Sequence, residues 1–387
     1  MPGFLIGTTV LDLSTVGPAS RATRILADFG AQVIKIGPIP GKGPTVLKPP
    51  FYAYSGQRYI KKMAIDLRQD AGRQVFMSLA TKADVVVESF RPGVVDRLGI
   101  GHKAMSEVNP RIVYCSTSGY GQDGTRSKWA GHDINYLATG GFLGLSQAGA
   151  DGAPPIPGAT VADAAGGGMQ AAMCIIAALL GRTNTGIGTY LDVSATDGVM
   201  WLMSLAIDEE LAIGSNPKPG HDILTGRYAC YGVYQAKDGK WLSVGAIEPK
   251  FYTNLCKALG CDKWIGCQHD DSVQDQIRED MQQAFSSKAR DEWVALLADS
   301  DCCVAPVLSV CEVAQDQEFA QRGLIGRAKD QTKGEFSQIA PLLAGMQVPA
   351  GPIDLPDPNR SDYEEILVSA GLSEDSIREL FDSEVIA

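Results

Sequence analysis

TTVLDLSTVGPASRATRILADFGAQVIKI, residues Thr8–Ile36, places one amphipathic segment between two short apolar ones. Thr9–Leu13 and Gln32–Ile36 are short, apolar and rich in β-branched residues. Between them, the apolar side chains of Pro18–Phe29 recur at helical spacing, and the segment ends at Gly30. This order of strand, helix and strand predicts a βαβ unit, whose two strands are parallel.

The same alternation continues through the first half of the chain. The expected strands and helices that follow are the strand Ala64–Leu67, the helix Asp70–Lys82, the strand Asp84–Glu88, the helix Lys103–Asn109 and the strand Arg111–Ser116. Repeated βαβ units indicate an α/β fold, and we expect a large domain with a parallel, Rossmann-like sheet.

The pattern changes near Pro217–Gly220. Tyr228–Gln235 and Trp241–Gly245, joined by a turn at Lys237-Asp238-Gly239, predict a β-hairpin, and helical patterns follow it. We therefore expect a large α/β domain at 1–200, a linker at 201–224 and a smaller α+β domain at 225–330. Residues 335–387 are expected to return to the large domain.

Composition excludes some classes of protein. The 387 residues include 34 Lys and Arg against 45 Asp and Glu, a net charge of −11, which argues against a nucleic-acid-binding protein. The nine cysteines are odd in number and form no CxxC pair, which favours reduced thiols and a cytoplasmic location. The apolar stretch Met169–Leu180 is too short to cross a bilayer, so we expect a buried helix there and no membrane span. Met200–Met203 is likewise assigned to a helix core.

One glycine motif follows the expected strand Arg111–Ser116. Gly119, Gly121 and Gly124 form a literal G-x-G-x-x-G, but Thr125–Trp129 is a poor helix start, which disfavours a nicotinamide-binding site. The HExxH, P-loop and G-x-S-x-G motifs are absent, so metalloprotease, NTPase and esterase functions have no support. We expect no metal site.

Three residues stand out as candidates for proton chemistry. His132 lies in a run of polar groups, and imidazole exchanges protons near neutral pH; a structural histidine is the alternative. Asp163 precedes three glycines and a long apolar helix, where it either caps the helix or faces a ligand. In the second case, the glycines let that ligand approach the backbone closely. Glu248 follows the hairpin and is either a functional carboxylate or an ordinary first-turn acid.

Together these segments resemble the family III CoA-transferase superfamily, and within it the alpha-methylacyl-CoA racemases. The resemblance extends over nearly the whole chain and rests on Val10–Leu13, Leu26–Ala31, Ala64–Leu67, Glu88–Gly93, Gly119–Gly121, Gly131–Tyr136, Asp163, Gly245–Pro249 and Cys303–Leu308. The GHDINY and GAIEP segments are the ones similar to racemases rather than to transferases.

The resemblance implies an interlocked homodimer, with each active site between the large domain of one subunit and the small domain of the other. It also implies that His132, supported by Glu248, is one acid/base and that Asp163 is the other. Donors near the helix after Asp163 are expected to stabilise an enolate. The ligand is an acyl-CoA, and because coenzyme A is part of the substrate, no separate cofactor is expected.

Negative overall charge makes the basic residues informative about CoA binding. Arg91 is the expected phosphate or adenine contact, because a guanidinium both stacks and pairs bidentately. The remaining residues that we assign to the substrate site are Arg58, Lys61, Lys62, Gly119, Gly121, Asp133 and Tyr136. For Lys61 and Lys62, solvated surface charge is an equal alternative.

The expected function is interconversion of (2R)- and (2S)-2-methylacyl-CoA thioesters through an enolate. The first alternative is a CoA-transferase in which Asp163 is a nucleophile that forms an acyl-aspartyl anhydride. A non-catalytic acyl-CoA-binding subunit is the second.

Overall fold

The computed structural model describes residues 3–43, 58–149, 151–331, 333–341, 349, 351–357 and 360–387. The chain divides into two compact units. Unit 1 comprises Met1–Gly141, Pro157–Ser204 and Gln317–Ala387, and unit 2 comprises Phe142–Ile156 and Leu205–Asp316. These bounds differ from the expected domains, because residues 142–156 belong to unit 2 and residues 317–330 to unit 1. That either unit is a separate domain stays a prediction.

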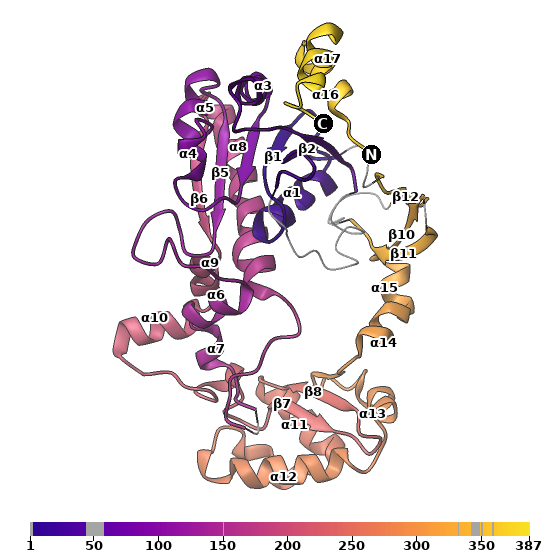
Figure 1. Ribbon diagram of the computed structural model, residues 1–387. Coiled ribbons are helices and arrows are strands. Elements are labelled where there is room, and N and C mark those ends of the chain that lie inside the picture. The colour runs from indigo at the N-terminus through magenta and orange to yellow at the C-terminus, as the bar shows by residue number, and fades with distance from the viewer. Residues whose placement is uncertain are drawn as a thin grey trace. The chain divides into compact units, whose positions relative to one another are not determined.

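Unit 1 contains a six-stranded parallel sheet of order β3-β2-β1-β4-β5-β6 (Figure 1). Its strands are β1 (Thr9–Asp12), β2 (Gln32–Gly37), β3 (Ile60–Ala64), β4 (Val85–Glu88), β5 (Val113–Ser118) and β6 (Thr189–Ser194). This strand order is that of dinucleotide-binding Rossmann folds, so the expected α/β fold with a parallel, Rossmann-like sheet is confirmed. A ligand of such a sheet binds at the carboxyl ends of the strands, where the order reverses between β1 and β4.

The position expected for the third strand is wrong. The strand ends at Ala64 rather than beginning there, because the residues that follow pair with the C-terminus of the chain. The Asp66 N–H donates to the Val385 carbonyl at 2.9 Å, and Ile65 forms an antiparallel bridge with Ile386. A purely local pattern does not reveal a partner more than 300 residues away.

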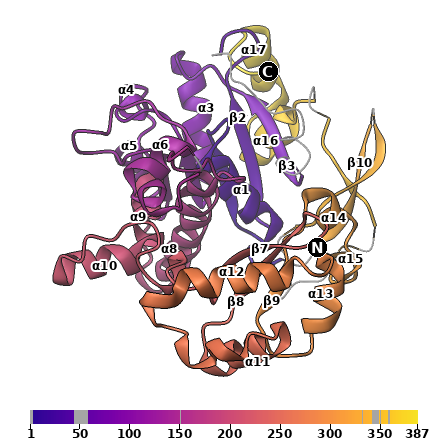
Figure 2. The same cartoon turned by 90° about the horizontal axis from the view of Figure 1, so that it is seen from below.

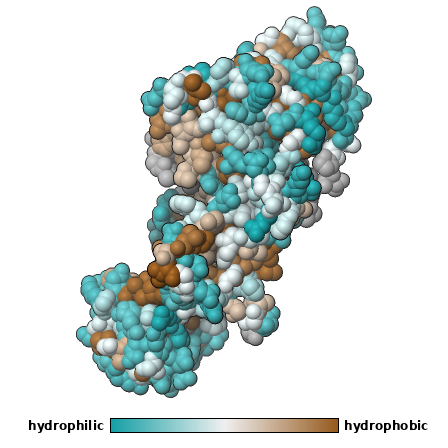
Figure 3. Space-filling model, turned by 90° about the vertical axis from the view of Figure 1, so that its left-hand side faces the viewer, coloured by the Kyte–Doolittle hydropathy of each residue, from teal (hydrophilic) through white to brown (hydrophobic). Residues whose placement is uncertain are grey.

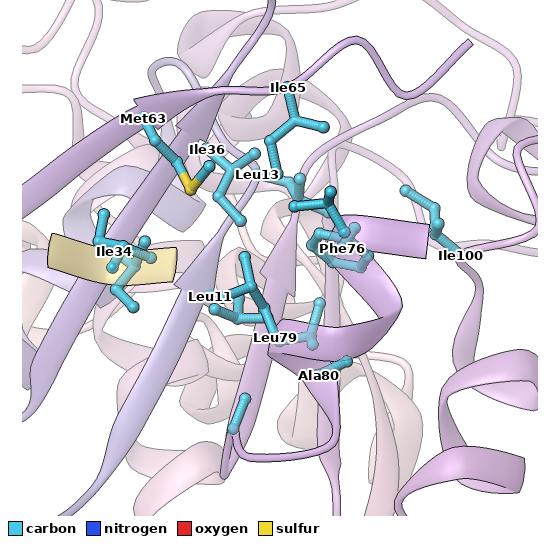
Figure 4. Close-up of a cluster of buried hydrophobic side chains, with 14 of the residues drawn as sticks. Leu11, Leu13, Ile34, Ile36, Met63, Ile65, Phe76, Leu79, Ala80 and Ile100 are labelled. Carbon is cyan, nitrogen blue, oxygen red and sulfur yellow. The ribbon is translucent and has the colours of Figure 1, made fainter. Parts of the chain in front are cut away.

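Successive residues of each strand point to opposite faces of the sheet, and both faces are covered. Val10 and Val33 pack against α1 (Pro18–Asp28) and α8 (Gln170–Thr185). Leu11 and Ile34 belong to the core on the other face, shown in Figure 4. The helices that contribute to this second core include α3 (Asp70–Ala80), α5 (His102–Val108), α16 (Tyr363–Ala370) and α17 (Glu374–Asp382).

The other elements of unit 1 lie outside the sheet. They are α4 (Val94–Arg97), α6 (Asp133–Thr139), the π-helix η1 (Ala162–Met169), α9 (Ala195–Leu202), α15 (Gln317–Gln321) and the strands β10 (Ile325–Asp330), β11 (Gly334–Ile339) and β12 (Ile353–Asp354). The last three strands form a small sheet of order β11-β10-β12.

Unit 2 is built on a three-stranded antiparallel sheet of order β7-β8-β9. Its strands are β7 (Tyr231–Gln235), β8 (Trp241–Gly245) and β9 (Val304–Pro306), so the expected hairpin is present. The helices are α7 (Phe142–Leu145), α10 (Ser204–Ile213), α11 (Pro249–Leu259), α12 (Gln274–Phe285), α13 (Arg290–Leu297), α14 (Val310–Gln315) and the short turns η2 (Ile223–Thr225), η3 (Asp262–Cys267) and η4 (Asp271–Val273). Helices α11, α12 and α13 cover one face of the sheet (Figure 2), and Tyr252, Phe285 and Trp293 belong to the core that they form with it. This is an α+β arrangement.

Two apolar segments that were expected in the core are partly exposed. Helix η1 continues into α8, and Ala162–Thr185 is one helix of 24 residues, long and apolar enough by composition to cross a membrane. A single helix of this kind is weak evidence for a membrane span, because core helices of globular proteins have the same composition. Met173 on α8 is 59% exposed and Trp201 on α9 is 71% exposed. Figure 3 also shows a brown apolar patch at the level of α10 in Figure 1. The single chain therefore leaves apolar helix faces uncovered.

Candidate active site

Four of the predicted site residues lie together in unit 1: His132, Asp133, Tyr136 and Asp163. His132 is the N-cap of α6, where its N–H donates to the Asn135 side-chain oxygen at 3.0 Å. Asp133 begins the helix, and its carboxylate accepts the N–H of Asp163 at 2.8 Å. Residues 30 positions apart are thereby joined, and the His132 charge acts on Asp163.

Asp163 lies inside the first turn of η1 rather than before the helix. It is therefore not the N-cap, and Asp133 supplies the acceptor for its N–H. The same bond means that the N–H of Asp163 is already occupied. The expected enolate donors near the helix after Asp163 stay a prediction. Short π-helical segments inside α-helices are rare and frequently mark functional sites.

The three glycines after Asp163 pack against protein. A Cβ on Gly166 would lie 2.8 Å from the Ala195 carbonyl, and one on Gly167 would lie 2.6 Å from Pro18. A Cβ on Gly168 would lie 2.8 Å from the Cβ of Arg21. The expectation that they admit a ligand to the backbone is wrong, because α1 and α9 already occupy the space. Their small size lets α1, α9 and η1 approach closely and so fixes the position of Asp163.

Electrostatics make Asp163 a weaker acid than usual. Partial burial raises its pKa, and the neighbouring Asp133 carboxylate raises it further. The positive charges of Arg21 and His132 act in the opposite direction. A carboxylate with a raised pKa is a better proton acceptor, and its acid form is a usable donor closer to neutral pH.

Tyr136 connects this cluster to the glycine motif. Its hydroxyl donates to the Gly131 carbonyl at 2.5 Å, and burial raises its pKa to about 12. A Cβ on Gly119 would lie 2.3 Å from the Tyr136 ring, so only glycine fits there. Gly121 has a φ of +86° and donates its N–H to the Ser118 hydroxyl at 2.8 Å, which makes it a turn residue. The structure thus gives Gly119 and Gly121 packing and turn roles beside the cluster.

The assignment of Arg58 to CoA binding is wrong. Its side chain is fully buried, and its Nε and Nη2 donate to the two carboxylate oxygens of Asp28 at 2.7 and 2.8 Å. Its Nη1 donates to the carbonyl of Ile339 at 2.7 Å, and its Nη2 also donates to that of Ala340 at 3.1 Å. Four of its five N–H groups are thus used within the protein, and because the side chain has no exposure, a phosphate does not reach it. It instead ties α1 to the strand β11.

Lys61 and Lys62 face the C-terminal helices. Lys61 forms an ion pair with Glu365 of α16 at 2.6 Å, and both side chains are partly exposed. The N–H of Lys62 donates to the Asp362 carboxylate at 2.9 Å. The structure therefore places these two residues in the attachment of the C-terminal segment to β3, and it does not bring them to His132 or Asp163.

Arg91 is placed differently, at the carboxyl end of β4. It is exposed, and its guanidinium forms no hydrogen bond with any described residue. Beside it, a cavity of about 330 Å³ opens at the ends of β1, β2 and β4, where Leu13, Ile36 and Phe90 contribute to its lining. This is the end of the sheet at which α/β folds bind nucleotides.

Glu248 belongs to unit 2. It is the N-cap of α11 and is exposed. The pKa of the Cys303 thiol is raised by burial and also by the negative charge of Glu248. Its relation to His132 stays a prediction.

Sequence reasoning missed Arg21 and Thr160. The Arg21 Nη2 donates to the Thr160 hydroxyl at 2.5 Å, and its charge acts on Asp163. Only the packing of α1 across Gly168 brings them together, so no local pattern indicates their role.

Known proteins are similar to this chain in sequence and in fold. Residues 5–360 match CoA-transferase family III. The human alpha-methylacyl-CoA racemase is 35% identical over 99% of this chain and 97% of its own length. The acetyl-CoA:oxalate CoA-transferase of Acetobacter aceti is 30% identical over 82% of this chain and 84% of its length. The crystal structure of Rv3272 from Mycobacterium tuberculosis superimposes with a TM-score of 0.76 at 25% identity, covering 91% of this chain and 96% of that one.

The match extends beyond single motifs, since it includes both the sheet of unit 1 and the segments that carry His132, Asp163 and Glu248. The chain belongs to CoA-transferase family III, a group of enzymes whose members similar to it include both racemases and CoA-transferases.

Proposed function

We propose that this protein is a racemase that interconverts the (2R) and (2S) forms of 2-methylacyl-CoA thioesters. The observation that carries the proposal is the cluster of His132 and Asp163, an imidazole and a carboxyl of raised pKa on adjoining elements. Inverting a carbon centre by proton transfer requires two acid/base groups, one for each face of the α-carbon.

In the proposed reaction one group, in its basic form, takes the α-proton. The C–H electron pair becomes the C=C bond of an enolate, and negative charge moves to the thioester oxygen. The other group, in its acid form, returns a proton to the opposite face, and the electron pair re-forms the C–H bond. One proton leaves and one enters, so no oxidant, reductant or metal is required. The two groups must be in opposite protonation states, and they exchange those states in each turnover.

We propose that Arg91 contacts the phosphates or adenine of CoA, with the nucleotide in the 330 Å³ cavity at the ends of β1, β2 and β4. We expect Arg91→Ala to weaken the binding of CoA about tenfold, in the range of a lost charge-assisted hydrogen bond. Isothermal titration with CoA measures this effect. Arg97→Ala on α4 is the matched control, and an equal loss in both variants would contradict the assignment.

We further propose an interlocked homodimer in which Glu248 of one subunit supports His132 of the other. The exposed apolar faces of α8 and α9, with Met173 and Trp201, support it, because contiguous exposed apolar surface marks association sites. We expect the protein to sediment at twice the mass of the 41.1 kDa chain. A monomer at micromolar concentration would contradict the proposal. A cytoplasmic location is also proposed, since all nine cysteines are unpaired.

The decisive experiment incubates the protein with a single enantiomer of a 2-methylacyl-CoA in heavy water. We expect deuterium at the α-carbon together with the opposite enantiomer, without any added carboxylic acid. Binding of the acyl-CoA without α-exchange would refute the racemase.

The alternative is a CoA-transferase with Asp163 as nucleophile, and the partial exposure of this residue favours it as a second candidate. There the carboxylate attacks the thioester, CoA leaves as thiolate, and an acyl-aspartyl anhydride remains. Trapping of a hydroxamate at Asp163 by hydroxylamine would support this reaction. It does not require His132.

A further inference from the structure

Glu88 is a buried acid that the proposed reaction does not use. It ends β4, and the residue is 1% exposed. On the neighbouring strands it pairs in register with Ser116 of β5, which pairs with Asp192 of β6. The three side chains therefore form one row across the carboxyl end of the sheet.

Each of the two carboxylates in this row accepts a backbone N–H from a loop that follows a strand. The Glu88 carboxylate accepts the N–H of Phe90 at 2.7 Å, and the Ser116 hydroxyl donates to it. Asp192 accepts the N–H of Gln122 at 2.9 Å. Phe90 lines the 330 Å³ cavity, and Arg91 follows it directly. The bond to Glu88 thus determines where the loop places both residues.

The surroundings of Glu88 disfavour its charge. Burial is the main cause that raises the pKa of Glu88 to about 7, and the carboxylates of Asp96 on α4 and of Asp192 raise it further. The hydrogen bonds from Ser116 and Phe90 lower this pKa. The other titratable groups that feel its charge are Tyr114, Cys115 and Tyr190 on β5 and β6, and all three have raised pKa values. Its carboxyl therefore changes charge within the physiological range while the acceptor for Phe90 stays in place.

We propose that Glu88 is the positioning residue of the CoA-binding loop and that its ionisation weakens CoA binding as the pH rises through neutrality. This inference rests on the proposed function, since it takes the cavity to hold the CoA nucleotide. The direction of this pH dependence follows from the charge of the Glu88 carboxylate. CoA brings phosphates to the wall that Phe90 forms, and a new negative charge behind this wall repels them, whereas the neutral carboxyl does not.

The test measures the Kd of CoA by isothermal titration between pH 6.0 and pH 8.5. The quantity compared is the Kd at pH 8.5 divided by the Kd at pH 6.0. We expect this ratio to be roughly fivefold larger for the wild type than for Glu88→Gln, the size of effect that a single partly buried charge gives. The amide keeps an oxygen for the Phe90 N–H but does not ionise. Titration of the ligand's own phosphates cancels, because both proteins bind the same CoA.

Glu107→Gln removes an exposed acid on α5 and is the matched control, which we expect to follow the wild type. Glu88→Leu removes the acceptor as well as the charge, and we expect it to bind CoA at least about tenfold more weakly than Glu88→Gln at every pH. If Glu88→Leu does not fold, the pH profile of Glu88→Gln still decides. An equal pH dependence in wild type and Glu88→Gln overturns the inference. A wild type that binds no CoA overturns the proposed function itself.

Discussion

Asp163→Asn will lower the racemisation of a 2-methylacyl-CoA by at least about a thousandfold while leaving the Kd of CoA within about twofold. General acid–base catalysis by one group contributes about 10²–10⁴ in rate, and a two-base reaction stops when either group cannot exchange a proton. Asparagine keeps the size of the side chain and does not ionise. Chiral chromatography of the acyl-CoA measures racemisation, and Asp123→Asn, on the exposed loop after β5, is the matched control.

His132→Gln is expected to lose racemisation to a similar degree, since it removes the second group. Isotope exchange separates the two roles. With one base left, each variant is expected to incorporate deuterium from heavy water into only one enantiomer, and the two variants are expected to select opposite enantiomers. Full racemisation by either variant would refute the assignment of the two groups.

The pH profile provides an independent check on Asp163. In the direction in which it acts as base, it must be ionised, so the rate falls as the pH drops through its pKa. Because burial and Asp133 raise that pKa, the acidic limb of kcat/KM is expected above the ordinary value of 3.8 for aspartate. Asp133→Asn removes one of the two causes, and this limb is expected to move to lower pH.

Arg58→Met will destabilise the protein by about 3–5 kcal/mol, the range for breaking a buried ion pair by removing one partner. The loss removes the two bonds that the buried Asp28 carboxylate accepts from Arg58, while the ion pair of Asp28 with Arg24 at 3.8 Å remains. It also removes the donors to Ile339 and Ala340. Methionine retains most of the apolar contacts of the arginine stem, so the change reports mainly on the charge and its hydrogen bonds.

Urea unfolding measures the loss, and Lys61→Met is the matched control. Lys61 and Glu365 form an ion pair whose side chains are 32% and 62% exposed, and such pairs contribute about 0–1 kcal/mol. Adding Asp28→Leu to Arg58→Met is expected to restore much of the lost stability, because the buried carboxylate that lost its two bonds from Arg58 is then removed as well. Equal effects of Arg58→Met and Lys61→Met would contradict this account.

Local patterns predicted much of unit 1. Short apolar runs rich in β-branched residues identify the strands at Thr9–Leu13 and Gln32–Ile36, and Pro18 and Gly30 delimit the helix between them. These signals depend on neighbours within a few residues, so they are visible without the fold. The edge strand β6 was missed because Thr189–Ser194 has little apolar alternation, and its pairing with β5 exists only in three dimensions.

The sequence by itself determined the α/β class, the family resemblance and the candidates His132, Asp163 and Glu248. The tertiary structure alone decided what surrounds each group. Arg58 looks like a phosphate ligand until Asp28 is seen against it, and Glu88 looks like an ordinary acid until Asp96, Asp192 and burial are found around it. The reason is physical: whether a charge is paired, exposed or suppressed depends on dielectric and distance, and residues far apart in the chain set both.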